Sequence, residues 1–181
     1  MDSLAGHFLI ASPSILDPNF HRAVVFITAH SDEGAVGVIL NRRSDATVGD
    51  AVPQLGSVTD LTDPVFVGGP VNPEGVAVLA EFHDPDQAGV VVIEDIGFVA
   101  LDDALEDGAP ELERTRVFAG VAGWGPDQLE DELERDDWIV LDAEPNDAFA
   151  DDAEEMWVRV LARNGGEYAL LATMPPDPSL N

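Results

Sequence analysis

Short apolar runs rich in β-branched residues recur along the chain, and glycine, proline or aspartate stands between most of them. Runs of about four to eight such residues are typical of strands, and the three intervening residue types are typical of turns. Several runs are apolar at nearly every position, which favours strands buried on both faces. The sequence therefore predicts a sheet with strands at residues 7–11, 22–30, 35–40, 64–71, 75–82, 89–95, 114–120 and 138–143.

Turns and helices are predicted between these strands. Gly34 closes the turn at residues 31–34, which predicts a hairpin between the second and third strands. Helical spacing of apolar residues, N-caps and C-terminal end signals predict four helices. One covers residues 101–108, and a second begins at Pro126. A third runs from near Asp151 to the glycine pair 165–166, and a short one runs from the N-cap Thr47 to near Pro53. No repeat or low-complexity linker interrupts the chain, so we expect one mixed α/β domain over residues 1–181 with an extended tail at about 174–181.

Acidic residues outnumber basic ones by 36 to 8, which gives a formal net charge of −28, and all eight basic residues are arginine. A field of this sign repels phosphate backbones and anionic lipids, so direct nucleic-acid binding and membrane binding are both disfavoured. Residues 141–155 carry seven acidic side chains and no basic one. We interpret that run as a solvated surface. Acid excess without lysine is also typical of proteins adapted to high salt, although a GC-rich genome would favour arginine as well.

Cysteine is absent, which excludes disulfides, thiolate ligands and cysteine nucleophiles. The four histidines, at positions 7, 21, 30 and 83, include no pair at the spacing of a helical metal site, and no calcium-loop pattern occurs. We therefore predict no metal site and no cofactor. The first residues lack the basic and apolar stretches of a signal peptide, and the longest apolar runs are of strand length, so we expect a cytoplasmic protein.

Gly120, Gly123 and Gly125 precede the helix predicted from Pro126, which is where a phosphate-binding loop would lie. Their spacing matches neither the dinucleotide fingerprint nor the Walker pattern, and the chain has no lysine. Asp127 and the acidic residues after it would repel a phosphate. We interpret the glycines instead as residues that allow a sharp turn and a close approach of helix and sheet.

The stretch "AGWGPDQLEDEL" (residues 122–133) resembles the Gly-Trp-Gly-Pro-x-Gln-Leu-Glu-x-Glu signature of the YqgE/AlgH family. Residues 12–42, the "VGGPV" block at 67–71 and Trp157 agree with that family in the same order. The resemblance implies an α+β fold in which helices surround a strongly bent, partly barrel-closed mixed β-sheet. It also implies a bacterial protein without established activity. The family carries the label of a transcriptional regulator, but no helix-turn-helix pattern in this sequence supports that role. The chain departs from the family at Thr28 and Arg43, where relatives often have Cys and Pro.

Thirteen residues at strand ends and loop corners are candidates for a ligand-binding cleft: Ser12, Pro13, Asp17, Phe20, Arg22, Asn41, Gly68, Gly69, Pro70, Gly123, Trp124, Gly125 and Gln128. Structural roles are the alternative. Asp17 would cap the turn at Pro18, and Arg22 would pair with Asp17 or another carboxylate. Asn41 would adopt a left-handed turn conformation, and Trp124 would cover the core.

Three functions remain open on this basis. The first is an accessory or regulatory protein that binds a small molecule or a protein partner, neither of which the sequence identifies. The second is an enzyme, a hydrolase or a transferase, that uses Asp17, Arg22 and a histidine. The third is a transcriptional regulator that binds DNA directly, which the net charge opposes.

Overall fold

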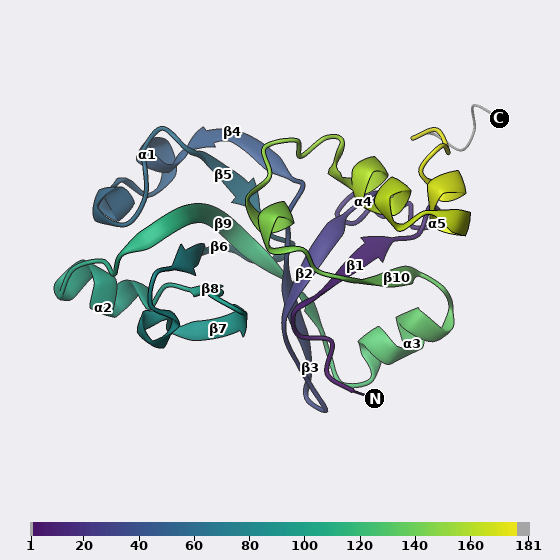
Figure 1. Cartoon of the computed structure of the whole chain (residues 1–181), viewed down its shortest axis with the longest axis horizontal. Coiled ribbons are helices and arrows are strands. Elements are labelled where there is room, and N and C mark those ends of the chain that lie inside the picture. The colour runs from purple at the N-terminus through teal and green to yellow at the C-terminus, as the bar shows by residue number, and fades with distance from the viewer. Residues whose placement is uncertain (1, 177–181) are drawn as a thin grey trace.

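The computed structural model describes residues 2–176, and the part of the predicted tail beyond them, with Leu180, lies outside the described residues. Ten strands form a mixed sheet in the order β10-β1-β2-β3-β9-β6-β8-β7, to which β4 and β5 attach through a parallel pairing of β5 with β9 (Figure 1). The strands are β1 (His7–Ala11), β2 (Val24–Ser31), β3 (Gly34–Ile39), β4 (Arg43–Thr47), β5 (Pro64–Val67), β6 (Val71–Phe82), β7 (Val90–Ile93), β8 (Ile96–Phe98), β9 (Leu112–Trp124) and β10 (Trp138–Asp142). The helices are α1 (Val48–Ala51), α2 (Leu101–Glu106), α3 (Gln128–Glu134), α4 (Met156–Asn164) and α5 (Gly166–Leu171), with 3-10 turns η1 (Pro53–Ser57), η2 (Pro85–Gln87) and η3 (Pro145–Phe149).

The long strand β9 joins the two parts of the sheet. Its C-terminal end pairs with β3, and the rest pairs with β6 and β5. Figure 1 shows it curving from the part that carries α1 and α2 to the part that carries α3, α4 and α5. Within the described residues no pairing joins the outer strands β10 and β7, so the predicted partial closure into a barrel is not confirmed.

Strand β1 shows why its apolar run has no polar face. Phe8 and Ile10 belong to the core cluster that includes α4 residues such as Trp157. Leu9 and Ala11 point to the opposite side and join a second cluster beneath α3. Successive side chains of a strand alternate between faces, and here helices cover both faces. The predicted double burial is confirmed for this strand.

A third core cluster lies beneath α1, η1 and α2 and includes Val48, Leu55 and Ala104. Thr47 begins α1 as predicted, because its hydroxyl accepts from the Asp50 amide while the Asp50 carboxylate accepts from the Thr47 amide. This reciprocal capping box compensates for the short helix, whose first amides have no partners inside the helix.

The glycine-rich stretch is mostly strand, not loop. The prediction that the strand ends at residue 120 is wrong, because β9 continues to Trp124 and pairs Gly123 with Val36. Gly120 has a φ of +73°, and a Cβ built on it would lie 2.4 Å from the Gly69 carbonyl oxygen. Close backbone contact therefore explains Gly120, whereas a Cβ on Gly123 would meet nothing nearer than 3.5 Å.

Two helices begin later than predicted. The helix expected from Pro126 begins at Gln128, because Asp127 adopts a left-handed φ of 61°. The helix expected from near Asp151 begins at Met156. It ends at Asn164, before the glycine pair as expected, but Gly166 then begins a further helix, α5, which was not predicted. Two strands, β4 and β8, were not predicted either. Within the described residues no helix has the length and apolar character needed to cross a membrane.

Candidate functional site

The structure does not bring the thirteen predicted site residues together in one cleft, and eight of them line three separate hollows. One hollow, beside α3, is lined by Asp17, Phe20, Gly123, Trp124 and Gln128. A second is lined by Gly69 and Pro70, and a third by Asn41. The remaining candidates are described by their position or contacts. Ser12 bonds the Ser14 hydroxyl, Pro13 follows it in the loop after β1, the Gly68 amide donates to Ala119, and the Gly125 amide donates to Gln128 Oε1.

Asp17 and Arg22 do not form the predicted pair. Asp17 Oδ1 accepts a hydrogen bond from the Asn19 amide at 2.8 Å. The Asp17 carboxylate therefore caps the turn at Pro18, as the structural alternative predicted. Arg22 instead donates to the Met174 carbonyl, and its guanidinium lies 4.4 Å from the centre of the Trp157 ring. A site that needs both groups together has no support in this arrangement.

Asn41 has a structural role different from the predicted one. Its Oδ1 accepts from the Val24 amide and its Nδ2 donates to the Arg22 carbonyl, both at 2.9 Å. The side chain is 8% exposed, and its position is not among those with a left-handed backbone, which Arg22 adopts instead with a φ of 55°. Asn41 therefore fastens the β3–β4 corner to the start of β2.

The acidic run at residues 141–155 is not simply solvated, which corrects the interpretation from sequence. Asp147 is 4% exposed, and its two oxygens lie 2.5 Å from Arg159 and 2.8 Å from Arg163. Arg159 also binds Asp152, and Arg163 also binds Glu144. A buried carboxylate needs such partners, and these contacts hold the segment against α4.

Arg116 of β9 fastens the same segment from the sheet side. It is 7% exposed, donates to the Ala150 carbonyl at 2.9 Å and lies 3.6 Å from Asp151. Its guanidinium also stacks 4.2 Å from the centre of the Phe66 ring. Burial lowers the pKa of Arg116, and neighbouring Asp151 opposes that shift.

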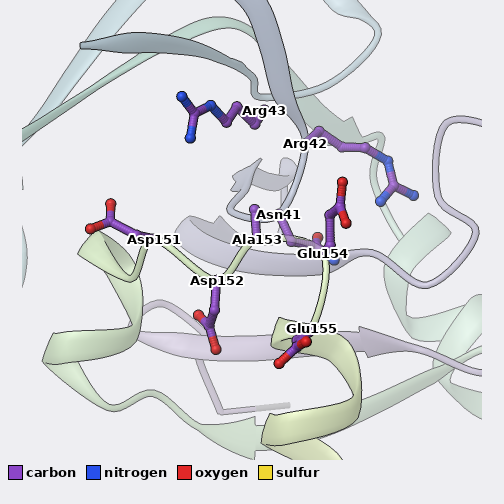
Figure 2. A pocket seen from close by; sticks show the side chains of 8 residues that line it. All are labelled: Asn41, Arg42, Arg43, Asp151, Asp152, Ala153, Glu154 and Glu155. Carbon is purple, nitrogen blue, oxygen red and sulfur yellow. The ribbon is translucent and has the colours of Figure 1, made fainter.

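Arg42 and Arg43 lie at the corner between β3 and β4, opposite the acidic segment at residues 151–155. They line a hollow of about 520 Å³ with Asn41 and with residues 151–155. Figure 2 shows the Arg42 and Arg43 side chains above this hollow, pointing in opposite directions, with the carboxylates of Asp151, Asp152 and Glu155 below them and the Glu154 carboxylate pointing to the arginine side. Within the described residues, neither Arg42 nor Arg43 lies within ion-pair distance of a carboxylate.

The two arginines also line a second hollow, of about 380 Å³, on their other side. Its other walls are mainly apolar and consist of Pro18, Asn19, Ile39, Val67, Gly69, Pro70 and Pro73. Arg42 is half-buried and donates to the His21 carbonyl, and burial lowers its pKa. Arg43 is exposed. The corner therefore presents two positive groups beside an apolar wall, in a chain that is otherwise strongly negative.

These residues do not suggest a metal centre. In residues 2–176 no three histidine, aspartate or glutamate side chains are grouped so that they could hold a metal ion. The arginine corner offers donors and positive charge, which suit an anionic group rather than a cation.

Comparison with known proteins supports the family resemblance. A family model described as AlgH-like matches residues 8–169. The chain belongs to the AlgH-like family. A UPF0301 protein of Streptomyces coelicolor is 42% identical over 187 residues, which cover 100% of this chain and 97% of that protein. A UPF0301 protein of Mycobacteroides abscessus is 42% identical over 186 residues, covering 98% of this chain and 88% of that protein.

Solved structures show the same fold. The crystal structure of protein DIP2367 from Corynebacterium diphtheriae superposes with a TM-score of 0.83 at 30% identity, covering 93% of this chain and 91% of that one. The solution structure of the AlgH protein from Pseudomonas aeruginosa superposes with a TM-score of 0.73 at 28% identity, covering 96% and 95%. The mixed sheet with its covering helices is therefore shared with both of these proteins.

Sequence reasoning missed Arg42 and Arg43 as site residues. A signal was present, because two adjacent arginines at a strand end are unusual in a chain with eight basic residues among 181. The sequence alone does not show which arginines pair with carboxylates in the folded chain.

Proposed function

We propose that this protein is a cytoplasmic accessory or regulatory protein that binds an anionic group at the Arg42–Arg43 corner. The group would be a carboxylate attached to an apolar body, presented by a small molecule or by a partner protein. Arg42 and Arg43 supply the charge, and the apolar wall formed by Pro70, Pro73 and Val67 supplies the contact for the body of the ligand.

The observation that supports the proposal is that, within residues 2–176, these two guanidinium groups have no carboxylate partner. Within the described residues, the arginines that form ion pairs with carboxylates are Arg114, Arg116, Arg135, Arg159 and Arg163, whereas Arg22 donates to the Met174 carbonyl. Arg42 and Arg43 face an acidic segment yet do not pair with it. An anion that reaches the corner would gain charge-assisted hydrogen bonds without displacing an existing ion pair.

The proposal limits the kind of anion. Nucleic acid would carry many phosphates to a surface of net charge −28, and the repulsion would oppose binding outside the corner. A single carboxylate meets only the local positive charge. We therefore disfavour direct DNA binding and place any regulatory role in the capture of a small ligand or a protein segment. An enzymatic site at Asp17 and Arg22 gains no support, since the two side chains make separate contacts.

Titration calorimetry with N-acetylleucine tests the proposal, with inorganic phosphate as a second anion and the neutral N-acetylleucinamide as the matched ligand without charge. We expect saturable binding of N-acetylleucine that weakens as NaCl rises, and at least tenfold weaker binding of the amide. R43Q is the informative variant, because Arg43 is exposed and its loss should leave the fold intact.

We expect R43Q to weaken N-acetylleucine binding about tenfold, which corresponds to about 1.4 kcal/mol. R135Q is the matched control. Arg135 is also exposed, lies away from the Arg42–Arg43 corner and forms an ion pair with Asp137 at 3.1 Å. Equal affinities of wild type, R43Q and R135Q would reject the Arg42–Arg43 corner as the site.

A further inference from the structure

The hollow beside α3 has an aromatic floor. It has a volume of about 340 Å³ and lies between the loop after β1, the start of α3 and β10. Trp124 and Trp138 meet edge to face with ring centres 5.8 Å apart, and Phe20 lies 6.2 Å and 5.7 Å from their centres. Gly123, which has no side chain, lines the same hollow. The rings are locked against one another, so the floor is formed before any ligand arrives.

Glu132 of α3 is fixed within this hollow by neutral donors. Its Oε2 accepts both indole Nε1–H groups, from Trp124 at 2.8 Å and from Trp138 at 2.7 Å. Its Oε1 accepts from Gln128 Nε2 at 3.0 Å. These bonds orient the carboxylate but leave its negative charge in place. In the described part of the chain no arginine or histidine pairs with Glu132.

Other charged groups at the hollow do not neutralise Glu132. Among the described residues that line it, Arg135 is the only basic one, and it pairs with Asp137 at 3.1 Å. Asp17 adds a further carboxylate and is exposed. The hollow therefore combines aromatic carbon with an excess of fixed negative charge, next to exposed apolar surface at Leu16, which is 62% exposed.

We infer that this hollow is a binding site for an organic cation, an ammonium or guanidinium group carried on an alkyl stem. The alkyl stem packs on the ring atoms of Phe20 and the tryptophans, and the charged head approaches Glu132 and Asp17. Aromatic rings and carboxylates both attract such a cation, and the net charge of −28 raises its concentration near the surface.

The inference concerns a different site and a ligand of opposite charge from the proposed function, so each can fail alone. Butylammonium tests a small ammonium compound, and N-acetylarginine amide tests a side chain presented by a protein partner. Butanol is the matched neutral ligand. The indole Nε1–H resonances are the readout, because Trp124 and Trp138 line the hollow while Trp157 donates to the Ala11 carbonyl in the core.

We expect at least one of the two cations to shift the Trp124 and Trp138 resonances in a saturable manner at constant ionic strength, with the Trp157 resonance unchanged. The cation that saturates the resonance shifts at the lower concentration indicates whether the natural ligand is a small ammonium compound or a side chain presented by a protein partner. Butanol should bind at least tenfold more weakly. Shifts that do not saturate, or that include Trp157 to the same extent, would overturn the inference in favour of general attraction to an acidic surface.

E132Q should weaken cation binding at least tenfold, since glutamine keeps one acceptor for the indoles but removes the charge. E134Q, which changes an exposed glutamate on the same helix, is the matched control and should bind as wild type does. If E132Q does not fold, D17N gives the second test, because an asparagine there would keep an acceptor for the Asn19 amide. Unchanged cation affinity in the variant that folds, or an equal loss in E134Q, would contradict the assignment.

Discussion

His30 Nε2 lies 2.9 Å from Glu130 Oε1 and bonds it across 100 residues of sequence, tying β2 to α3. The other ring nitrogen, Nδ1, accepts the Leu4 amide at 3.0 Å. Because Nδ1 is an acceptor, the neutral ring carries its proton on Nε2 and donates it to Glu130. One buried imidazole thus connects the N-terminal segment, the sheet and the helix.

Replacing His30 should loosen all three elements. We expect H30A to lower the free energy of unfolding by about 1–3 kcal/mol, because a buried side chain with two hydrogen bonds is removed and the Leu4 amide loses its acceptor. Urea denaturation measures the loss. The H30Q variant, which keeps a polar side chain, should lose less, and an H30A protein as stable as wild type would show that the two bonds contribute nothing.

Acid should weaken the protein through Asp152. The hydrogen bond from Arg159 lowers the pKa of the Asp152 carboxyl below its ordinary value. A carboxyl whose folded pKa is depressed contributes stability above its unfolded pKa, and that stability is lost as pH falls through the folded value. We therefore expect D152N to flatten the fall in urea midpoint between about pH 5 and pH 2. D131N, on the exposed face of α3, should leave the slope unchanged.

Asp147 should be the most sensitive acidic position in the run at 141–155. Removing its charge leaves Arg159 and Arg163 without their shared buried partner. We expect D147N to cost about 2–3 kcal/mol, below the value for a fully buried pair because both arginines are partly exposed. D151N changes a fully exposed carboxylate in the same segment, so it should change the urea midpoint far less. Equal losses of stability in D147N and D151N would contradict the expectation that the buried carboxylate contributes more than the exposed one.

The position of Asp147 illustrates what the sequence could not provide. It lies in a run rich in acidic residues and alanine, and nothing local shows that it is buried while Asp151 is exposed. Burial is decided by Arg159 and Arg163, which lie on a helix that follows the run. Strand β4 could likewise not be predicted from its own residues. These polar residues form a strand because β5 pairs with them.

Local patterns were sufficient where both faces of an element are buried or where a cap is complete within a few residues. The apolar run of β1 and the Thr47 capping box could be predicted for that reason. The candidate site depended on long-range pairing. Phe20, Trp124 and Gln128 were selected and do share a hollow, but Glu132, whose carboxylate accepts from Trp124 and Gln128, was considered only as one of the acidic residues that would repel a phosphate.

Gly120 and Gly123 make a matched pair for the packing interpretation of the glycine stretch. A methyl group at residue 120 would meet the Gly69 carbonyl oxygen at 2.4 Å on a backbone with a φ of +73°, whereas residue 123 has a nearest neighbour at 3.5 Å. We expect G120A to cost at least about 2 kcal/mol and G123A less than about 1 kcal/mol. Thermal denaturation of both variants tests this order, and a more damaging G123A would reverse the interpretation.

Salt should stabilise the protein, because most of its carboxylates have no positive partner to offset their repulsion. The chain carries 36 acidic and 8 basic residues, and five arginines are already held in ion pairs within the described structure. Screening shortens the range of repulsion from about 10 Å at 0.1 M salt to about 3 Å at 1 M. We expect the melting temperature to rise between low and molar NaCl, with the same rise in KCl because screening depends on ionic strength. A melting temperature that stays flat in both salts would mean that repulsion between surface carboxylates does not limit stability, and it would remove the physical reason to read the composition as an adaptation to high salt.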